Sequence, residues 1–346
     1  MTAKKRTNAT PGGSILTHQR PSAVRLFALV FAVVATLAIV LGATLSAAHA
    51  APVGKLKQFK VPTADIQPRS ITNGSDGNIW FTLSDPNANV PSQIGRITPA
   101  GVITEFDPAC NGCILTDFIQ GPGDILYYTS NDPFLGRITT SGQILDPIAM
   151  PETDVLAGNL AVHDDEIWFT DFNNDSLWRY DVVSEQFTQF PVPEPSDVVV
   201  DEAGIVWFTA PLEPGIGRLD PATGAVTVTP TTLVPRQITI AADGDIWFTA
   251  RFDPQGVGRL VPATGEVTEF PLTNVGPEGI AASPDGTVWF TQTTKGNIAQ
   301  ITDAGVITEG KVVKNSEPFG ITVAPDDGNP WYTMFEANKI ATLQLR

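Results

Sequence analysis

Charged side chains recur close to a repeated Trp-Phe-Thr motif of the sequence. Acidic side chains among them could bind a metal ion, and basic ones could bind a carboxylate. The candidates are Arg69, Asp117, Asp171, Arg236, Glu278 and Glu317. The carboxylates of Asp117, Asp171 and Glu278 would offer the oxygen ligands that Mg²⁺ or Ca²⁺ prefers. The arginines would hold a carboxylate through paired hydrogen bonds. The alternative is a channel wall of ion pairs that satisfy one another around water, and both readings stay open.

Other residues that often carry chemistry predict structural roles here. His163, in AVHDDEIWF, is the only histidine after residue 50. Its place at a hairpin turn predicts a surface residue rather than a general base. No Gly-x-Ser-x-Gly elbow, phosphate-binding loop or EF-hand spacing occurs. Cys110 and Cys113 are the only cysteines, and their spacing in an exported chain predicts a local disulfide across a turn.

A sequence repeat predicts the strands that position the charged residues. An aromatic-aromatic-Thr signature begins, at spacings of 39 to 47 residues, at Trp80, Tyr127, Trp168, Trp207, Trp247, Trp289 and Trp331. A period near 40 residues that is rich in strand-sized pieces is typical of a β-propeller. We therefore predict an all-β fold: one seven-bladed β-propeller over residues 51–346, with four strands in each blade.

Each repeat divides into four strand-sized pieces separated by turn residues. In the fifth repeat these are QITIA, DIWFTA, GVGRLV and EVTEFP, with turns at Asp243-Gly244 and at Pro262–Gly265. Glycines of the third strand, such as Gly258, leave room for a large side chain, expected to be the aromatic of the repeat. The last repeat stops after three strands, and residues 54–62 match the missing fourth. We expect this N-terminal strand to complete the last blade and close the ring.

Topology predicts where a ligand would bind. The first two strands of a blade run antiparallel, so residues before strand one and after strand two share one face, called here the channel face. The hairpin turns, including that of His163, lie on the other face. Two rings of positions on the channel face vary between repeats while Trp-Phe-Thr hardly changes. They form the expected ligand site, although solvent exposure would explain the same variation.

The two rings are defined by their place in the repeat. The position after the recurring proline comprises Arg69, Asp117, Gly158, Ser196, Arg236, Glu278 and Phe319. The position after the threonine comprises Leu83, Ser130, Asp171, Ala210, Ala250, Gln292 and Met334.

The first 50 residues differ in kind from the rest. Five basic residues precede an apolar run from Leu26 to about Leu45, and Ala48 and Ala50 form a signal-peptidase pattern. We predict a secreted or extracytoplasmic protein whose residues 1–50 are a signal peptide, cleaved after Ala50. The alternative is an uncleaved membrane anchor, because a run of about 20 apolar residues approaches spanning length.

The charge of the mature chain excludes two classes of partner. Cleavage removes five of the 21 basic residues and none of the 37 acidic ones, which leaves 16 bases and a formal net charge of −21. Such a surface repels nucleic acid and anionic membranes. We therefore expect no nucleic acid partner, and no membrane contact beyond the N-terminal segment.

The repeated elements P-x-x-I, DG-x-(I/V)WFT, IGRIT and G-x-(I/V)TEF resemble the streptogramin lyase (virginiamycin B lyase) family over about residues 55–346. The resemblance implies a monomeric seven-bladed propeller that opens a cyclic depsipeptide at its ester bond, with a magnesium ion. A base would remove the proton α to the ester carbonyl while the metal stabilises the charge that develops.

The residues that would carry this chemistry differ from the family pattern. In the last repeat the family lyases read Glu-Pro-His-Gly-Ile, with the histidine as proton carrier. The matching residues here are Glu317, Pro318, Gly320 and Ile321. Phe319 stands at the histidine position, Glu278 replaces a second histidine one repeat earlier, and Met334 falls where a metal-linked glutamate is expected. Phenylalanine accepts no proton and methionine binds magnesium poorly, so the resemblance carries the fold rather than the activity.

Two classes of function follow from these observations. The first is a secreted, non-lyase propeller that binds a small molecule, a glycan or a protein at the channel face. The second is a carbon–oxygen lyase or lactone hydrolase that acts on a cyclic ester with Mg²⁺ or Ca²⁺, held by Asp117, Asp171 and Glu278. We expect a monomer in either case.

Overall fold

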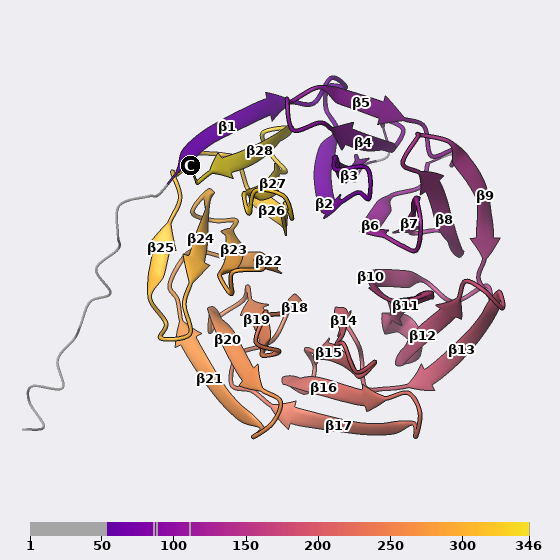
Figure 1. The fold of residues 1–346 in the computed structure, drawn as a ribbon, viewed down its shortest axis with the longest axis vertical. Coiled ribbons are helices and arrows are strands. Elements are labelled where there is room, and N and C mark those ends of the chain that lie inside the picture. The colour runs from indigo at the N-terminus through magenta and orange to yellow at the C-terminus, as the bar shows by residue number, and fades with distance from the viewer. Residues whose placement is uncertain (1–53, 86, 88, 111, 346) are drawn as a thin grey trace, which may run out of the picture. The chain divides into compact units, whose positions relative to one another are not determined.

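The computed structural model describes residues 54–85, 87, 89–110 and 112–345. They form seven four-stranded antiparallel sheets arranged as blades around a central channel, as Figure 1 shows. The prediction of an all-β, seven-bladed propeller is confirmed. The predicted signal peptide and its cleavage site lie outside the described residues. Within the described part, no helix is long and apolar enough to cross a membrane.

The strands follow the repeat, and blades are numbered here from the first complete repeat. Blade 1 comprises β2 (Gln67–Asn73), β3 (Ile79–Ser84), β4 (Gln93–Ile97) and β5 (Ile103–Phe106). Blade 2 comprises β6 (Leu115–Gln120), β7 (Ile125–Ser130), β8 (Phe134–Thr139) and β9 (Ile144–Ala149). Blade 3 comprises β10 (Ala157–His163), β11 (Glu166–Asp171), β12 (Ser176–Asp181) and β13 (Gln186–Pro191), with the 3₁₀ turn η2 (Phe172–Asn174) after β11.

The remaining four blades repeat this order. Blade 4 comprises β14 (Val198–Val200), β15 (Val206–Ala210), β16 (Gly215–Asp220) and β17 (Ala225–Pro230). Blade 5 comprises β18 (Ile238–Ile240), β19 (Ile246–Ala250), β20 (Gly256–Val261) and β21 (Glu266–Pro271). Blade 6 comprises β22 (Pro277–Ala282), β23 (Val288–Gln292), β24 (Asn297–Ile301) and β25 (Ile307–Glu309). Blade 7 comprises β26 (Pro318–Val323), β27 (Pro330–Met334), β28 (Lys339–Gln344) and β1 (Lys55–Lys60).

The N-terminal strand closes the ring, as predicted. β1 pairs antiparallel with β28, from Lys55 opposite Gln344 to Lys60 opposite Lys339, and the two lie together in Figure 1. Phe59 stacks on Trp331 with ring centroids 5.7 Å apart. In blade 1 the outer-strand Phe106 stacks on Trp80 in the same way, at 5.4 Å. β1 therefore supplies the aromatic contact that the last repeat lacks, as well as the hydrogen bonds.

Large apolar side chains form the core in the layers between neighbouring blades. One such layer holds Trp168 and Leu177 of blade 3 with Val198 and Phe208 of blade 4. Fully burying a side chain of this size stabilises the fold by roughly 1.5–3 kcal/mol. The third-strand glycines make this packing possible: a Cβ at Gly258 would lie 2.1 Å from the Phe248 ring. The predicted role of these glycines beside the aromatic of the repeat is confirmed.

The threonine of Trp-Phe-Thr ties the inner strands together. In every blade its hydroxyl oxygen accepts a hydrogen bond from a backbone N–H at the start of its own inner strand, over 2.8–3.3 Å. Five of these hydroxyls also donate to a carbonyl of the next blade, over 2.6–3.2 Å, and they are Thr129, Thr209, Thr249, Thr291 and Thr333. The bond from Thr333 to the Arg69 carbonyl joins blade 7 to blade 1. The least variable polar residue of the repeat is therefore a structural link around the channel.

Candidate functional site

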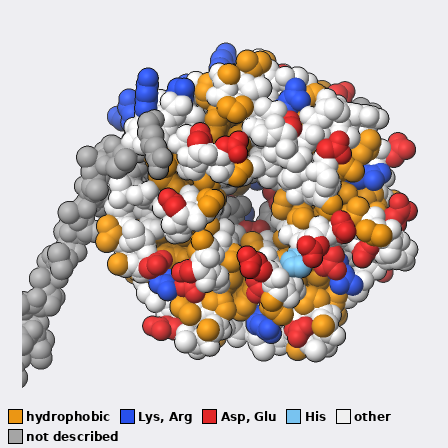
Figure 2. Space-filling view, in the orientation of Figure 1, with side chains coloured by type: hydrophobic (Ala, Val, Ile, Leu, Met, Phe, Trp, Pro, Cys, Tyr) orange, Lys and Arg blue, Asp and Glu red, His pale blue; other side chains and the backbone are white. Residues whose placement is uncertain are grey.

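A cavity of about 310 Å³ lies where the seven inner strands begin. All seven residues that follow the recurring proline position line it, and they are Arg69, Thr116, Gly158, Ser196, Arg236, Glu278 and Phe319. The channel face therefore holds a cavity at the predicted place. Figure 2 shows the central channel opening on one face of the ring, with acidic side chains scattered around it.

The placement of Asp117 in the first ring was wrong by one residue. The Asp117 N–H donates to Thr129 in blade 2, as the Ser70 N–H donates to Thr82 in blade 1. Asp117 is thus equivalent to Ser70, and Thr116 is equivalent to Arg69. The slip arose because Leu115 stands in blade 2 where the other repeats mostly carry proline. Asp117 nevertheless lines the same cavity.

The second ring does not face the channel. Its seven members, Leu83, Ser130, Asp171, Ala210, Ala250, Gln292 and Met334, are all buried. They lie at the end of the second strand of each blade, or one residue before it at Leu83, and this strand is covered by the strands on both sides and by the neighbouring blades. Side chains there pack inside the fold, so their variation between repeats does not mark a ligand site.

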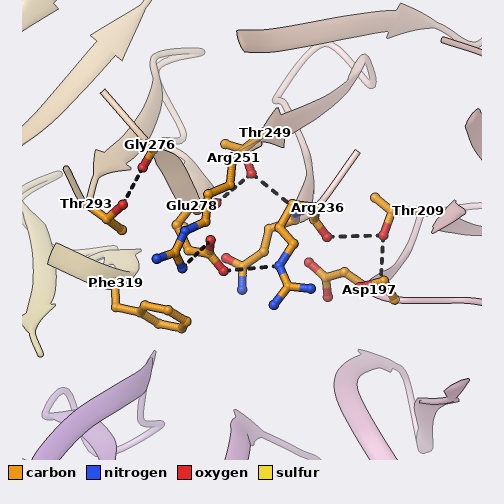
Figure 3. A network of polar contacts seen from close by, with 12 residues as sticks. Asp197, Thr209, Arg236, Thr249, Arg251, Gly276, Glu278, Thr293 and Phe319 are labelled. Carbon is orange, nitrogen blue, oxygen red and sulfur yellow. Dashed lines mark hydrogen bonds and ion pairs between the residues drawn. The ribbon is translucent and has the colours of Figure 1, made fainter. Parts of the chain in front are cut away.

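Glu278 is the centre of an ion-pair network in the cavity wall. Its side chain is 1% exposed. Arg236 Nε lies 3.3 Å from Oε1 and Arg251 Nη1 lies 3.1 Å from Oε2, and Figure 3 shows both guanidinium groups meeting this carboxylate. The backbone carbonyl of Glu278 accepts the hydroxyl of Thr249 at 2.6 Å. A buried carboxylate is stable only when charge and hydrogen bonds compensate it, and here both oxygens are engaged.

Phe319 and Arg69 form the adjoining part of the wall. The Arg69 guanidinium carbon lies 5.3 Å from the centroid of the Phe319 ring and 5.9 Å from that of Phe335. Arg251 also approaches Phe319, at 6.0 Å. Burial lowers the pKa of Arg69, Glu278 opposes this, and the nearby Arg236 and Arg251 add to the lowering. Cations over the faces of aromatic rings are favourable contacts, so Phe319 acts as a partner for arginine.

Two carboxyl groups occupy another part of the cavity. Asp117 accepts hydrogen bonds from Ser70 Oγ at 2.5 Å and from the Leu160 N–H at 2.8 Å. Asp197 accepts from the N–H groups of Val198 and Ile238 at 2.9 and 3.0 Å. Each links its blade to a neighbour, because Leu160 lies in blade 3 and Ile238 in blade 5.

Both carboxyl groups have raised pKa values. Burial raises the pKa of Asp117 despite its hydrogen bonds. Burial, helped by the negative charge of Asp117, raises the pKa of Asp197 to about 7, while backbone N–H groups and Arg236 act in the opposite direction. A carboxyl group that exchanges its proton near neutral pH can accept or donate a proton.

Sequence reasoning missed Asp197 and Arg251. Asp197 stands two residues after Pro195, and Arg251 stands two residues after Thr249. Each residue lies one position after a member of the two rings, Ser196 and Ala250, so the repeat contained the information needed to find both. Of the six charged candidates, Arg69, Asp117, Arg236 and Glu278 line the cavity.

The three predicted metal ligands are not brought together. Asp171 is fully buried, is absent from the cavity wall, and accepts a hydrogen bond from Asn174 at 2.9 Å. Glu317 is exposed and also lies outside the cavity lining. Within the described residues, no three His, Cys, Asp or Glu side chains are grouped so that they could hold a metal ion.

His163 and the cysteines lie away from the cavity. His163 ends β10 at a hairpin turn, beside Asp164 and outside the cavity lining. Cys110 and Cys113 are joined in a disulfide, as predicted.

The sequence pattern of the Virginiamycin B lyase family matches residues 44–228 and again residues 195–346. The chain belongs to the virginiamycin B lyase family. It is 28% identical over 190 residues to a virginiamycin B lyase of Nocardia farcinica, a match that covers 53% of this chain and 64% of that relative. The chain therefore spans slightly less than two thirds of the curated relative's length.

Solved structures of the family share the fold. A streptogramin B lyase structure superposes with a TM-score of 0.75 at 26% identity, covering 85% of this chain and 98% of that one. A catalytically inactive virginiamycin B lyase from Staphylococcus aureus, solved with quinupristin, gives 0.75 at 26% identity, covering 84% and 99%.

The residues present do not fit the magnesium ion that membership of the virginiamycin B lyase family suggests. Met334, at the position expected for a metal-linked glutamate, is fully buried and offers no oxygen. Both oxygens of Glu278 are held by arginines. Mg²⁺ prefers oxygen ligands in octahedral geometry, and no such donor set is assembled in the described part of the chain.

Proposed function

We propose that this member of the virginiamycin B lyase family is a binding protein that holds a small molecule in the channel-face cavity and does not open cyclic depsipeptides. The observation that carries the proposal is the packing of Phe319. It stands where the family resemblance expects the proton carrier, and its ring is covered by Arg69 and approached by Arg251. Among the described residues that line the cavity, none is a histidine.

The dimensions of the cavity support binding of a small ligand rather than a polymer. Its volume of about 310 Å³ is at the lower end of the range for pockets that enclose small ligands, roughly 300–1,000 Å³. The wall combines an apolar ring with a few convergent charged groups, which is the usual composition of such pockets. A glycan or a protein loop would engage the rim of the channel instead.

The direct test is ester opening of quinupristin, followed by mass spectrometry. We expect no product from the wild-type chain and none from Phe319→His. A histidine at 319 would lie beside two guanidinium groups, which disfavour its protonated form, and Met334 would still supply no metal ligand. The Staphylococcus aureus lyase without its inactivating substitution is the positive control. Ring opening by the wild-type chain, or by Phe319→His alone, would overturn the proposal.

One observation favours a second candidate, a hydrolase or lyase that acts on a smaller cyclic ester. The pKa of about 7 at Asp197 places a proton-exchanging carboxyl group in the cavity, which is the property of a general base. A panel of lactones tests it: turnover that falls at least about a hundredfold in Asp197→Asn would fit the usual contribution of such a base. Absence of turnover across the panel would remove this candidate.

A further inference from the structure

Arginines outnumber acidic partners in one part of the cavity wall. Arg69, Arg236 and Arg251 converge on this region from blade 1 and blade 5, and the single carboxylate among them is Glu278. Arg236 occupies one oxygen of Glu278 and Arg251 the other. The pKa of Arg69 reflects this crowding, since the charges of Arg236 and Arg251 both act to lower it. Three guanidinium groups share this one carboxylate. Asp197 acts on Arg236 from the other part of the cavity, and Arg69 is left without an ion-pair partner among the described residues.

Arg69 carries the excess charge. In the described part of the chain no carboxylate forms an ion pair with it, and its Nε is buried without a hydrogen-bond partner. Its contacts are the faces of Phe319 and Phe335. Guanidinium groups remain protonated in proteins, and a buried charge without a partner is costly. An anion placed beside Arg69 would relieve that cost, through paired hydrogen bonds if it is a carboxylate.

The grouping of arginines in the cavity contrasts with the negative net charge of the whole chain. The sequence has 37 acidic and 21 basic residues, so its general field repels anions. Two arginines nevertheless line one small cavity, and a third joins their network from its edge. Arg236 and Arg251 are paired with Glu278, whereas Arg69 forms no ion pair with an acidic side chain of the described residues.

The remaining walls restrict the kind of anion. Phe319 offers an apolar surface next to Arg69. Asp117 and Asp197 stand elsewhere in the same cavity and would repel a second negative charge. A dianion or an inorganic phosphate is therefore disfavoured, and so is a fully polar ligand.

We propose that the channel-face cavity binds a small organic monocarboxylate, whose carboxylate pairs with Arg69 and Arg236 and whose apolar body packs on Phe319. This inference rests on the proposed function, because it names the ligand class of the same cavity. It makes Arg69 the residue that selects a charged ligand over a neutral one.

The test compares matched acids and amides. Binding of phenylacetate, benzoate and cyclohexanecarboxylate is measured by calorimetry beside that of the corresponding amides, which have nearly the same shape and no charge. We expect at least about tenfold tighter binding of one or more acids than of the matching amide, as a charge-assisted bidentate contact provides. We also expect the affinity of the acids, and not of the amides, to fall with added salt.

Variants of Arg69 locate the contact. Arg69→Gln removes the charge without breaking a hydrogen bond of the guanidinium to any described residue, and the backbone carbonyl that accepts Thr333 is retained. We expect it to lose the preference for acids, and Arg69→Lys to recover only part of it because the ammonium lacks the planar fork. Arg218→Gln is the matched control: Arg218 lies over Trp207 in blade 4, outside the cavity lining, and its loss should leave binding unchanged.

Each outcome has a distinct meaning. Equal affinity for acids and amides, absence of binding by every carboxylate, or an unchanged preference in Arg69→Gln overturns the carboxylate assignment. Binding of amides alone would do so while leaving the proposed binding function in place. Failure of the proposed function itself is seen separately, as ring opening of quinupristin.

Discussion

At the scale of single residues, the channel-face cavity has two parts of opposite charge. Arg69 and Arg236 surround Glu278 and Phe319 in one part, and Asp117 and Asp197 form the other. The carboxyl groups are held by backbone N–H groups of neighbouring blades, whereas among the described residues the Arg69 guanidinium contacts aromatic faces. The acids are thus built into the frame of the ring, and Arg69 is the group left available to a ligand.

The raised pKa of Asp197 predicts how stability depends on pH. Because burial raises it from 3.8 to about 7, the folded chain keeps a proton between these values that the unfolded chain releases. The contribution of Asp197 to the free energy of unfolding is therefore largest below about pH 4, falls as pH rises to about 7 and is constant above. Each unit of difference between the folded and unfolded pKa corresponds to about 1.4 kcal/mol in the free energy of unfolding.

Asp197→Asn should remove this fall, because asparagine does not titrate. The measurement is urea unfolding at several pH values between about 4 and 8, with the exposed turn variant Asp303→Asn as control. The groups that face Asp197 are Asp117, Arg236 and the N–H groups of Val198 and Ile238. Parallel curves for wild type and Asp197→Asn would show that another group causes the dependence.

The position of individual residues in the cavity wall could be predicted where the repeat aligned cleanly. Arg69, Arg236, Glu278 and Phe319 follow a proline, so their place in the cavity could be read from the sequence. Asp117 was assigned to the neighbouring position because that repeat has no proline. The pairing of Arg251 with Glu278 depends on how long side chains reach across a blade boundary, which the repeat pattern does not encode.

At the scale of the elements, the threonine of the repeated signature links neighbouring inner strands. Thr249 Oγ1 accepts from the Gln237 N–H at 3.3 Å and donates to the Glu278 carbonyl at 2.6 Å. The second of these bonds sets the backbone that carries Glu278. Residues of the cavity wall are therefore positioned by a hydroxyl one blade away.

Replacing this threonine by valine tests the link. Thr249→Val keeps the shape and leaves the Gln237 N–H and the Glu278 carbonyl without partners, so we expect a loss of roughly 1–3 kcal/mol in the free energy of unfolding. Thr82→Val is the matched control, since Thr82 bonds only the Ser70 N–H within its own blade in the described contacts. A smaller loss is expected there. Equal losses in the two variants would mean that the inter-blade bond contributes nothing.

The fold was easier to predict from sequence than the site. Seven copies of one signature predict the same packing. A misaligned copy therefore does not change the predicted fold, because the other six still indicate it. Phe59 also matched the aromatic of the outer strands closely enough to identify β1 as the missing strand. A ligand site is formed by residues that differ between the copies, and nothing in the repeat averages out an error there.

At the scale of the whole molecule, the pairing of β1 with β28 and the hydrogen bond from Thr333 to the Arg69 carbonyl close the ring. β1 covers the outer edge of β28 along six residue pairs and places Phe59 on Trp331. An uncovered β28 would present a free edge to other chains.

Deleting residues 51–60 should therefore lower the midpoint of thermal unfolding and cause self-association. Light scattering after size-exclusion chromatography measures the second effect. Lys57→Gln, which alters an exposed side chain and keeps the strand, is the control. A deleted chain that remains monomeric with an unchanged midpoint would show that β1 is dispensable for closure.

The pairing of β1 with β28 also constrains the order in which the blades form during synthesis. A ribosome makes β1 before every other strand of the ring, and makes β28 after all of them. Six blades can collapse in order as they emerge, each against its predecessor, while the earliest segment waits for the latest. β1 cannot pair before β28 has been made, so we expect the sheet of blade 7 to be completed last, with the edge of β1 unpaired until then.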